Sequence, residues 1–251
     1  MQHLTILTGA SRGMGLAIAQ QLCAADALVL CISRGRADAL DALALERGAT
    51  LAQWSADLAD PAPVAARLRA WLGDRDARKL ASATLINNAG VVGGTGPLDA
   101  SSATAIATAL RVDLEAPMQL TAAFLAATSG WKLPRKVLNV SSGLGRRPMA
   151  GAALYCAAKS GMDHFSRCVA LEQEGLPNAA RIVSLAPGII DTDMQTELRA
   201  GDPALFPERA AFVQMKESGS LSTPADAARR LLAYMARADF GTKPVADVRD
   251  A

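Results

Sequence analysis

Three side chains that could carry proton chemistry lie within one stretch of the chain, Val137 to Ser166. Ser142 is followed thirteen positions later by Tyr155, and Lys159 comes four residues after that. Four residues make about one helical turn, so Tyr155 and Lys159 should project from the same face of a helix. The ordinary pKa of a phenol is about 10. A neighbouring ammonium favours the phenolate and lowers that pKa toward the range useful for proton transfer.

Ser142 should lie where a ligand can reach it. It follows the apolar run Val137–Val140, which predicts a buried strand. Ligands of open α/β sheets bind at the carboxyl ends of the strands. A Tyr-x-x-x-Lys spacing alone is more often an amphipathic helix with a core Tyr and an exposed Lys. The serine at a strand end favours proton chemistry over that interpretation.

A glycine-rich turn near the N-terminus predicts a phosphate-binding loop. Gly9, Gly13 and Gly15 come directly after the apolar run Leu4–Thr8, and a helical apolar pattern follows over Leu16–Ala25. Glycines let the backbone turn tightly and approach a pyrophosphate, whose charge a helix N-terminus favours. The spacing G-x-x-x-G-x-G differs from the G-x-G-x-x-G fingerprint, but its place between a strand and a helix indicates a dinucleotide site.

The residues after the second apolar run predict which coenzyme is bound. NAD enzymes usually carry an acid there that holds the ribose 2′-hydroxyl. This chain has Ser33, Arg34 and Arg36, with no acid before Asp38, and Arg12 of the glycine loop can reach the same region. Guanidinium groups bind phosphate with charge-assisted hydrogen bonds. The sequence therefore favours NADP(H), the alternative being that these arginines are solvated surface residues.

Apolar runs alternate with helical patterns along the chain, which predicts an α/β fold: a doubly wound parallel sheet of about seven strands with helices on both faces. The predicted strands are Leu4–Thr8, Ala27–Ile32, Thr50–Trp54, Ala83–Ile86, Lys136–Val140 and Arg181–Leu185, with a last short one around Thr242–Ala246. The predicted helices are Leu16–Ala25, Ala37–Glu46, Pro61–Leu72, Ser101–Thr128 with a kink or a junction at Pro117, Ala152–Gly175, and one beginning at Pro224. Residues 1–251 should form a single domain, in which residues 189–222 are an excursion with one or two short helices.

Composition excludes several classes of partner. Hydrophobic residues make up 51% of the 251 residues, aromatic residues 4%, and the formal net charge is +2. So few aromatic residues and so balanced a charge argue against a nucleic-acid surface. No apolar stretch is long enough to span a membrane or to serve as a signal sequence. The four cysteines show no metal-ligand spacing and lie in apolar segments, so we expect a reduced, cytoplasmic protein with no bound metal.

Six motifs in order resemble the short-chain dehydrogenase/reductases, and the resemblance spans essentially the whole chain. They are TGASRGMG, Asp57-Leu58, the NNAG segment Asn87–Gly90, Ser142, Tyr155 with Lys159, and Pro187-Gly188. The resemblance implies a single-domain Rossmann-type fold and hydride transfer between NADPH and a carbonyl carbon. It implies that Tyr155 donates the proton, that Ser142 holds the carbonyl oxygen, and that Lys159 lowers the pKa of Tyr155 and binds the nicotinamide ribose. Family members are usually dimers or tetramers built on the two long helices.

The resemblance also implies which residues contact the coenzyme and the substrate. Those expected to bind the coenzyme are Gly9, Ser11, Arg12, Gly13, Met14, Gly15, Ser33, Arg34, Asp57, Leu58, Asn87, Ala89, Gly90, Tyr155, Lys159, Pro187, Gly188, Ile190 and Thr192. Their position around the Ser–Tyr pair suggests that Leu144, Met149, Leu154 and parts of Ile189–Phe212 form an apolar substrate pocket, although methionines are more often core filler. The excursion at residues 189–222 could then order over the substrate as a lid.

The second half of the chain resembles a narrower group, sepiapterin reductase and the bacterial reductases of diketones such as benzil. The segments that carry this resemblance are ALYCAAK, VALEQE and LAPGIIDTDMQ. In sepiapterin reductase an aspartate near the C-terminus anchors the pterin, and Asp247 falls into that place. A carboxylate facing two parallel N–H donors would make a bidentate contact. The alternative is that Asp247 is a solvated residue of the tail.

One residue departs from the family pattern. Asp113 stands in the fourth helix where the family usually has Asn, which helps to hold a water that links Lys159 to solvent. A carboxylate can accept the same hydrogen bonds, and it would strengthen the charged form of Lys159. We expect Asp113 to belong to the catalytic set and to alter the pH profile of activity.

The sequence leaves three functional hypotheses. The first is an NADPH-dependent carbonyl reductase acting on a dicarbonyl or on a pterin side-chain ketone, either a sepiapterin reductase-like enzyme or a general diketone reductase. The second is a coenzyme-binding regulator without turnover, an idea supported only by Asp113. The third, an epimerase or dehydratase of nucleotide sugars, requires a longer C-terminal substrate region than the sixty residues after Asp191. The expected partner is therefore a small-molecule carbonyl compound.

Overall fold

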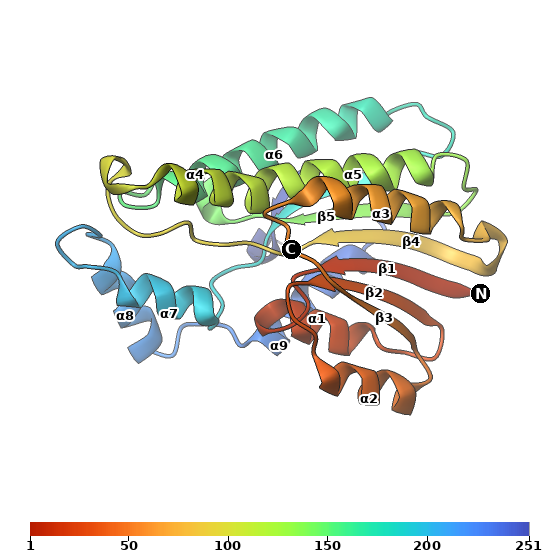
Figure 1. The fold of residues 1–251 in the computed structure, drawn as a ribbon, viewed down its shortest axis with the longest axis horizontal. Coiled ribbons are helices and arrows are strands. Elements are labelled where there is room, and N and C mark those ends of the chain that lie inside the picture. Colours follow the sequence, from red (N-terminus) through yellow and green to blue (C-terminus); the bar gives the residue numbers. More distant parts are fainter. Residues whose placement is uncertain (251) are drawn as a thin grey trace.

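The computed structural model describes residues 1–250 and contains one seven-stranded parallel sheet between two layers of helices (Figure 1). The strands are β1 (Gln2–Thr8), β2 (Ala27–Ser33), β3 (Thr50–Ser55), β4 (Leu80–Asn87), β5 (Arg135–Val140), β6 (Ala180–Ala186) and β7 (Val245–Asp247). Their order in the sheet is β3-β2-β1-β4-β5-β6-β7. Because the order reverses between β1 and β4, the carboxyl ends of these two strands border the crevice where such sheets bind ligands.

The helices are α1 (Gly13–Leu22), α2 (Asp38–Arg47), α3 (Pro61–Gly73), α4 (Ala103–Leu110), α5 (Ala116–Ala127), α6 (Ala153–Gln173), α7 (Asp193–Ala200), α8 (Arg209–Glu217) and α9 (Pro224–Ala236). Figure 1 shows α3, α4, α5 and α6 over one face of the sheet and α1, α2 and α9 over the other. The α7 and α8 helices extend beyond the carboxyl ends of the strands. The predicted doubly wound fold is confirmed.

Alternation along the strands divides the core between the two faces. Leu4 and Ile6 of β1 belong to an apolar cluster with Leu68 of α3 and Phe124 of α5. Leu7 belongs to the cluster on the other face. Successive side chains of a strand point to opposite faces, so a strand that is apolar on both sides can hold helices above and below the sheet.

The predicted helix Ser101–Thr128 is divided into two helices by a π-helical turn, η3 (Arg111–Glu115). Proline has no N–H, so Pro117 cannot donate to the carbonyl of Asp113 four residues earlier. The Ala116 N–H donates instead to the Arg111 carbonyl, five residues back, and α5 begins with Pro117 in its first turn. The predicted junction at Pro117 is therefore confirmed, and its π-helical turn carries Asp113.

Two sequence expectations need correction. The last strand, Val245–Asp247, begins later than the expected Thr242–Ala246, because pairing with Ser184–Ala186 of β6 sets its position. Among the cysteines, Cys23 and Cys31 are buried, whereas Cys156 is partly buried and Cys168 is exposed. Cys168 lies on the outer face of α6, where an apolar sequence neighbourhood does not guarantee burial. Within residues 1–250 no helix is long and apolar enough to cross a membrane, and no group of three or more metal-ligating side chains is present.

Candidate active site

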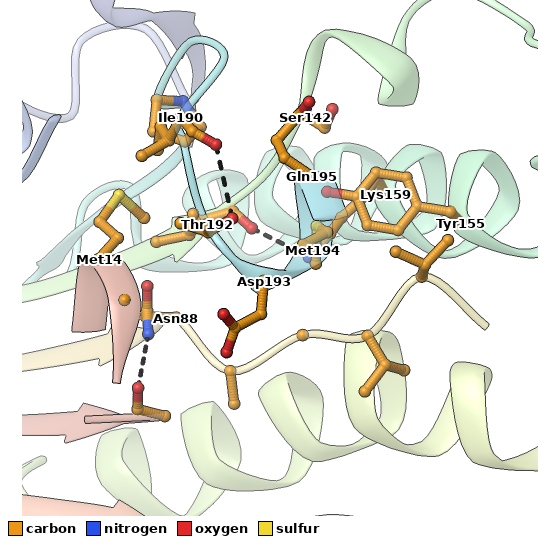
Figure 2. A pocket seen from close by; sticks show the side chains of 18 of the residues that line it. Met14, Asn88, Ser142, Tyr155, Lys159, Ile190, Thr192, Asp193, Met194 and Gln195 are labelled. Carbon is orange, nitrogen blue, oxygen red and sulfur yellow. Dashed lines mark hydrogen bonds between the residues drawn. The ribbon is translucent and has the colours of Figure 1, made fainter. Parts of the chain in front are cut away.

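A cavity of about 440 Å³ lies at the carboxyl ends of the strands. The glycine loop after β1, the loops after β2, β3, β4, β5 and β6, and the α7–α8 segment all contribute to its walls. Figure 2 shows Met14 and Asn88 at one side of it, Ser142, Tyr155 and Lys159 at the other, and the Ile190–Gln195 segment crossing the view between them. The cavity therefore borders both the glycine loop and the Ser142, Tyr155 and Lys159 side chains.

The three side chains expected to do proton chemistry all line this cavity. Tyr155 and Lys159 lie one turn apart in α6, and the Lys159 Nζ is 5.5 Å from the centre of the Tyr155 ring. Lys159 is buried, and its ammonium donates to the Val140 carbonyl at the end of β5 (3.1 Å). The Ser142 hydroxyl, in the loop that follows β5, accepts from the Leu144 N–H (3.2 Å). Strand β5 thus places the serine and fixes the lysine.

The pKa of Tyr155 is raised above its ordinary value, contrary to the net lowering expected from the sequence. Burial in the cavity wall is the largest cause, since it disfavours the phenolate. The Lys159 ammonium and the Ser142 hydroxyl lower the pKa of Tyr155, as expected, while the Asp113 carboxylate raises it. The phenol is therefore protonated at neutral pH and can donate its proton to a ligand.

Asp113 lies behind the lysine and is fully buried. Its Oδ1 accepts from the Val91 N–H (2.8 Å), whereas Oδ2 is buried without a hydrogen-bond partner among the described residues. Gly90 lies beside both side chains: a Cβ there would be 3.2 Å from Asp113 Oδ1 and 3.5 Å from Lys159 Nζ. Burial raises the pKa of Asp113 to about 6, against the lowering effects of Lys159 and the Val91 N–H.

The glycine loop has the close packing that phosphate-binding turns require. Gly9 has a positive φ of 71°, and a Cβ there would lie 2.9 Å from the Cα of Ala89. A Cβ on Gly15 would lie 2.0 Å from the Gly9 carbonyl oxygen. Helix α1 begins at Gly13, so its free N–H groups face the cavity. A cradle that only glycine can form at a helix N-terminus fits the diphosphate of a dinucleotide.

The end of β2 offers hydroxyl and guanidinium groups to the same cavity. The Ser33 hydroxyl accepts from the Ala10 N–H (2.7 Å), which ties the end of β2 to the glycine loop. Arg34 lines the cavity and forms no ion pair within residues 1–250. Arg12 pairs with Asp193 of α7 (3.0 Å) across the cavity mouth.

Most residues expected to contact ligands line the cavity, and four do not. Leu144 and Met149 line it, as do all the expected coenzyme residues except Asn87. Asn87 is buried and donates to Thr121 and Asn139 instead. Leu154 lies against Gly93, Asp113 lies behind Gly90, and Asp247 is buried under the C-terminal turn.

Sequence reasoning missed Asn88, the neighbour of Asn87. The Asn88 side chain lines the cavity and donates to the Thr8 carbonyl (2.9 Å), and the Asn88 N–H donates to the Thr8 hydroxyl (2.9 Å). These bonds join the ends of β1 and β4. Side chains alternate in direction along β4, so one of the two neighbouring asparagines should lie in the core and the next at the strand end. This alternation was the feature of the sequence that could have indicated Asn88.

A buried carboxylate holds the loop that carries Ser142. Asp163, one turn after Lys159 in α6, accepts from the hydroxyls of Ser141 (2.6 Å) and Ser184 (2.7 Å) and pairs with Arg146 (3.3 Å). Gly145 lets the loop lie directly on α6, because a Cβ there would be 2.9 Å from the Lys159 carbonyl oxygen. Asp163 therefore fixes both ends of the loop around Ser142 to the helix of Tyr155 and Lys159.

The α7–α8 segment covers the apolar part of the cavity. Leu198 and Phe212 from this segment form a cluster with Val92 and Met149, and the rings of Phe206 and Phe212 stack at 5.8 Å. One or two short helices were expected in residues 189–222, and the structure has two, α7 and α8.

A doubly wound sheet with a glycine cradle and a Ser–Tyr–Lys set at one cavity defines a nicotinamide-dependent oxidoreductase of carbonyl and alcohol groups. Residues 3–203 match the protein family described as short chain dehydrogenase. The chain belongs to the short-chain dehydrogenase family.

Individual relatives agree with this assignment. The chain is 35% identical to a benzil reductase ((S)-benzoin forming) of Bacillus cereus, over 90% of this chain and 92% of that protein. It is 34% identical to the sepiapterin reductase of Xenopus laevis, over 87% of this chain and 84% of that protein. A solved short-chain dehydrogenase/reductase from Burkholderia vietnamiensis is 36% identical over the full length of both chains, with a TM-score of 0.64.

Proposed function

We propose that the protein is an NADPH-dependent carbonyl reductase whose substrate is a vicinal dicarbonyl compound. The observation that carries this proposal is that Ser142, Tyr155 and Lys159 line the same cavity as the glycine cradle, with the Lys159 Nζ 5.5 Å from the centre of the Tyr155 ring. The dicarbonyl substrate class is supported by the benzil reductases among the relatives, because benzil contains two neighbouring carbonyl groups. The sepiapterin reductases among the relatives support reduction of a ketone, since sepiapterin carries a single side-chain ketone.

The coenzyme would lie along the strand ends. Gly9, Gly13 and Gly15 would hold its diphosphate, while Ser33 and Arg34 would hold the 2′-phosphate. Asp57, Leu58, Ala89 and Gly90 would border the adenine and ribose. Pro187, Gly188, Ile190 and Thr192 would border the nicotinamide, which supplies a hydride to the carbonyl carbon.

The side chains of α6 and of the β5 loop would then complete the reduction. The Tyr155 hydroxyl would give its proton to the carbonyl oxygen as that oxygen becomes negative, and the Ser142 hydroxyl would donate a hydrogen bond to the same oxygen. The products would be an alcohol, the oxidised coenzyme and the Tyr155 phenolate. The Lys159 ammonium stabilises that phenolate, and Asp113 lies behind the lysine. The α7–α8 segment would exclude water during the transfer.

The experiment measures NADPH and NADH consumption with benzil and with sepiapterin. We expect benzil to be reduced with NADPH, and Tyr155→Phe to lower kcat by about 10²- to 10⁴-fold without loss of coenzyme binding. Coenzyme binding with no turnover of either substrate would instead support a non-catalytic regulator. A preference for NADH would contradict the role given to Ser33 and Arg34.

A pterin reductase is a second candidate, because Asp247 lies next to the cavity residue Arg249. In this structure both carboxylate oxygens of Asp247 accept from Arg249, so a pterin would have to displace that side chain. Selective loss of sepiapterin reduction in Asp247→Ala, with benzil reduction retained, would favour the pterin candidate.

We also propose that the chain forms a homodimer or homotetramer through α4, α5 and α6. Leu110 and Met118 are exposed large apolar residues on the first two of these helices. Sedimentation equilibrium of the wild type and of Met118→Glu tests this proposal. A monomeric wild type would refute it.

A further inference from the structure

The C-terminal turn brings an arginine to the substrate end of the cavity. Strand β7 pairs with β6, and the short 3-10 turn η5 (Val248–Asp250) then carries Arg249 into the cavity wall. The Arg249 Nη2 lies 4.0 Å from the place of a Cβ on Gly143. Gly143 directly follows Ser142, so a guanidinium stands beside the group expected to hold the carbonyl oxygen.

Asp247 fixes one edge of this guanidinium. The Arg249 Nε donates to Oδ1 of Asp247 (2.8 Å) and Nη2 donates to Oδ2 (2.6 Å), while the Arg249 backbone N–H also donates to Oδ1 (2.9 Å). Arg249 lowers the pKa of the buried Asp247, so the pair is charged at neutral pH. An arginine has a second edge of N–H donors, and within residues 1–250 Nη1 of Arg249 has no partner.

The turn itself is fixed to the Ser142 loop. The Arg146 Nη2 donates to the Ala246 carbonyl (3.1 Å), and Arg146 Nε pairs with the buried Asp163 (3.3 Å). The free edge of Arg249 is therefore held in a defined position relative to Ser142. A fixed guanidinium can recognise the shape of a ligand group as well as attract its charge.

The charges around this end favour an anion. Arg147 also lines the cavity and has no ion pair within the described chain. Glu208, the residue before α8, lines the cavity as an unpaired carboxylate. The Asp247 carboxylate is already engaged by Arg249, so it does not oppose an anion.

We propose that Arg249 is a specificity-determining residue that selects substrates with a carboxylate next to the reacting carbonyl, that is, 2-oxo acids with an apolar group. The second guanidinium edge forms a bidentate, charge-assisted contact with that carboxylate. The apolar group lies against Leu144, Met149 and Phe212. This inference rests on the proposed function, because it places the reacting carbonyl at Ser142.

The test compares benzoylformate with its methyl ester, which has the same shape and no charge. Dissociation constants are measured by calorimetry on the protein saturated with oxidised coenzyme, so no turnover is needed. Benzil reduction by the wild type is measured separately. Arg249→Gln and Arg249→Lys are compared with Arg237→Gln, which breaks a similar pair with Asp239 (2.8 and 2.9 Å) outside the cavity.

We expect the wild type to bind the acid about tenfold more tightly than the ester, and Arg249→Gln to remove most of that ratio. Arg249→Lys should keep part of the ratio, and Arg237→Gln should leave it unchanged. Binding of the ester shows, for each variant, whether the cavity is still correctly folded. The proposal would be overturned if the wild type did not bind benzoylformate or bound it no more tightly than its methyl ester. It would also be overturned if Arg249→Gln lost affinity for the acid and for the ester equally. Acid preference without benzil reduction would refute the proposed reductase activity alone.

Discussion

Replacing Asp113 with Asn should stabilise the protein, and the gain should depend on pH. The ordinary pKa of this carboxyl is 3.8, and burial raises it to about 6 in the folded state. The folded protein therefore binds the proton more tightly than the unfolded chain does. Ionisation of Asp113 therefore has no effect on the free energy of unfolding below pH 3.8. Its destabilising effect grows as the pH rises and is complete above pH 6. Asparagine keeps the acceptor for the Val91 N–H without the charge.

The magnitude follows from the difference between the two pKa values. Each pKa unit corresponds to about 1.4 kcal/mol, so the ionised carboxylate destabilises the fold by about 3 kcal/mol at pH 7.5 and about 0.5 kcal/mol at pH 4. Asp113→Asn should raise the free energy of unfolding by these amounts. For a chain of this length, the larger value corresponds to a rise in Tm of roughly 6–12 °C.

Urea denaturation at pH 4 and pH 7.5 measures this change directly. Asp239→Asn is the control, because Asp239 is exposed and its pKa is lowered by Arg237. That carboxylate stabilises the fold above its ordinary pKa, so its removal should give no gain that grows with pH. A pH-independent effect of Asp113→Asn, or a less stable variant at pH 7.5, would refute the reasoning.

The same variant tests the link to catalysis. Below about pH 5 Asp113 is protonated and resembles an amide, so wild type and Asp113→Asn should show similar kcat. Above pH 6 the charged carboxylate of Asp113 raises the pKa of Tyr155 and makes it a weaker proton donor. The variant should then be faster by a few-fold. Superimposable pH–rate profiles would show that Asp113 does not act on the proton relay.

Three further substitutions test the coenzyme cradle, the serine loop and the coenzyme choice. Gly15→Ala should lower the free energy of unfolding by about 1–3 kcal/mol and abolish coenzyme binding, because its Cβ would lie 2.0 Å from the Gly9 carbonyl oxygen. The control for thermal melting is Gly73→Ala, whose Cβ would meet no atom within 4 Å. Asp163→Asn should destabilise the protein by about 1–3 kcal/mol, since it weakens the hydrogen bonds from the Ser141 and Ser184 hydroxyls. It should also lower kcat more than it weakens coenzyme binding. Equal effects on kcat and on coenzyme binding would indicate a purely structural role. Arg34→Gln should raise KM for NADPH about tenfold and leave KM for NADH unchanged, and a parallel change in both would contradict 2′-phosphate recognition.

The sequence predicted the order and type of the elements because their signals are local. Apolar runs marked the first six strands to within a few residues, and the glycine pattern between Thr8 and Leu16 marked the turn into α1. The spacing of Tyr155 and Lys159 predicted a shared helix face, since helical periodicity depends only on separation along the chain.

Other features depend on residues that are distant in sequence. No local pattern shows that Asp113 is fully buried, because its burial comes from the segment after β4 and from Lys159 of α6. Its net effect on the pKa of Tyr155 depends on that packing. The choice between Asn87 and Asn88 likewise depends on where β4 ends against β1.

The sequence by itself therefore determined that a glycine cradle, a serine at a strand end and a Tyr–Lys helix exist in this chain. Only the tertiary structure decided what surrounds them. It placed Arg249 beside Gly143, more than a hundred residues away in sequence, and engaged Asp247 with that arginine. Periodicity fixes which face of an element a side chain occupies, whereas contacts between loops depend on how the sheet brings the strand ends together.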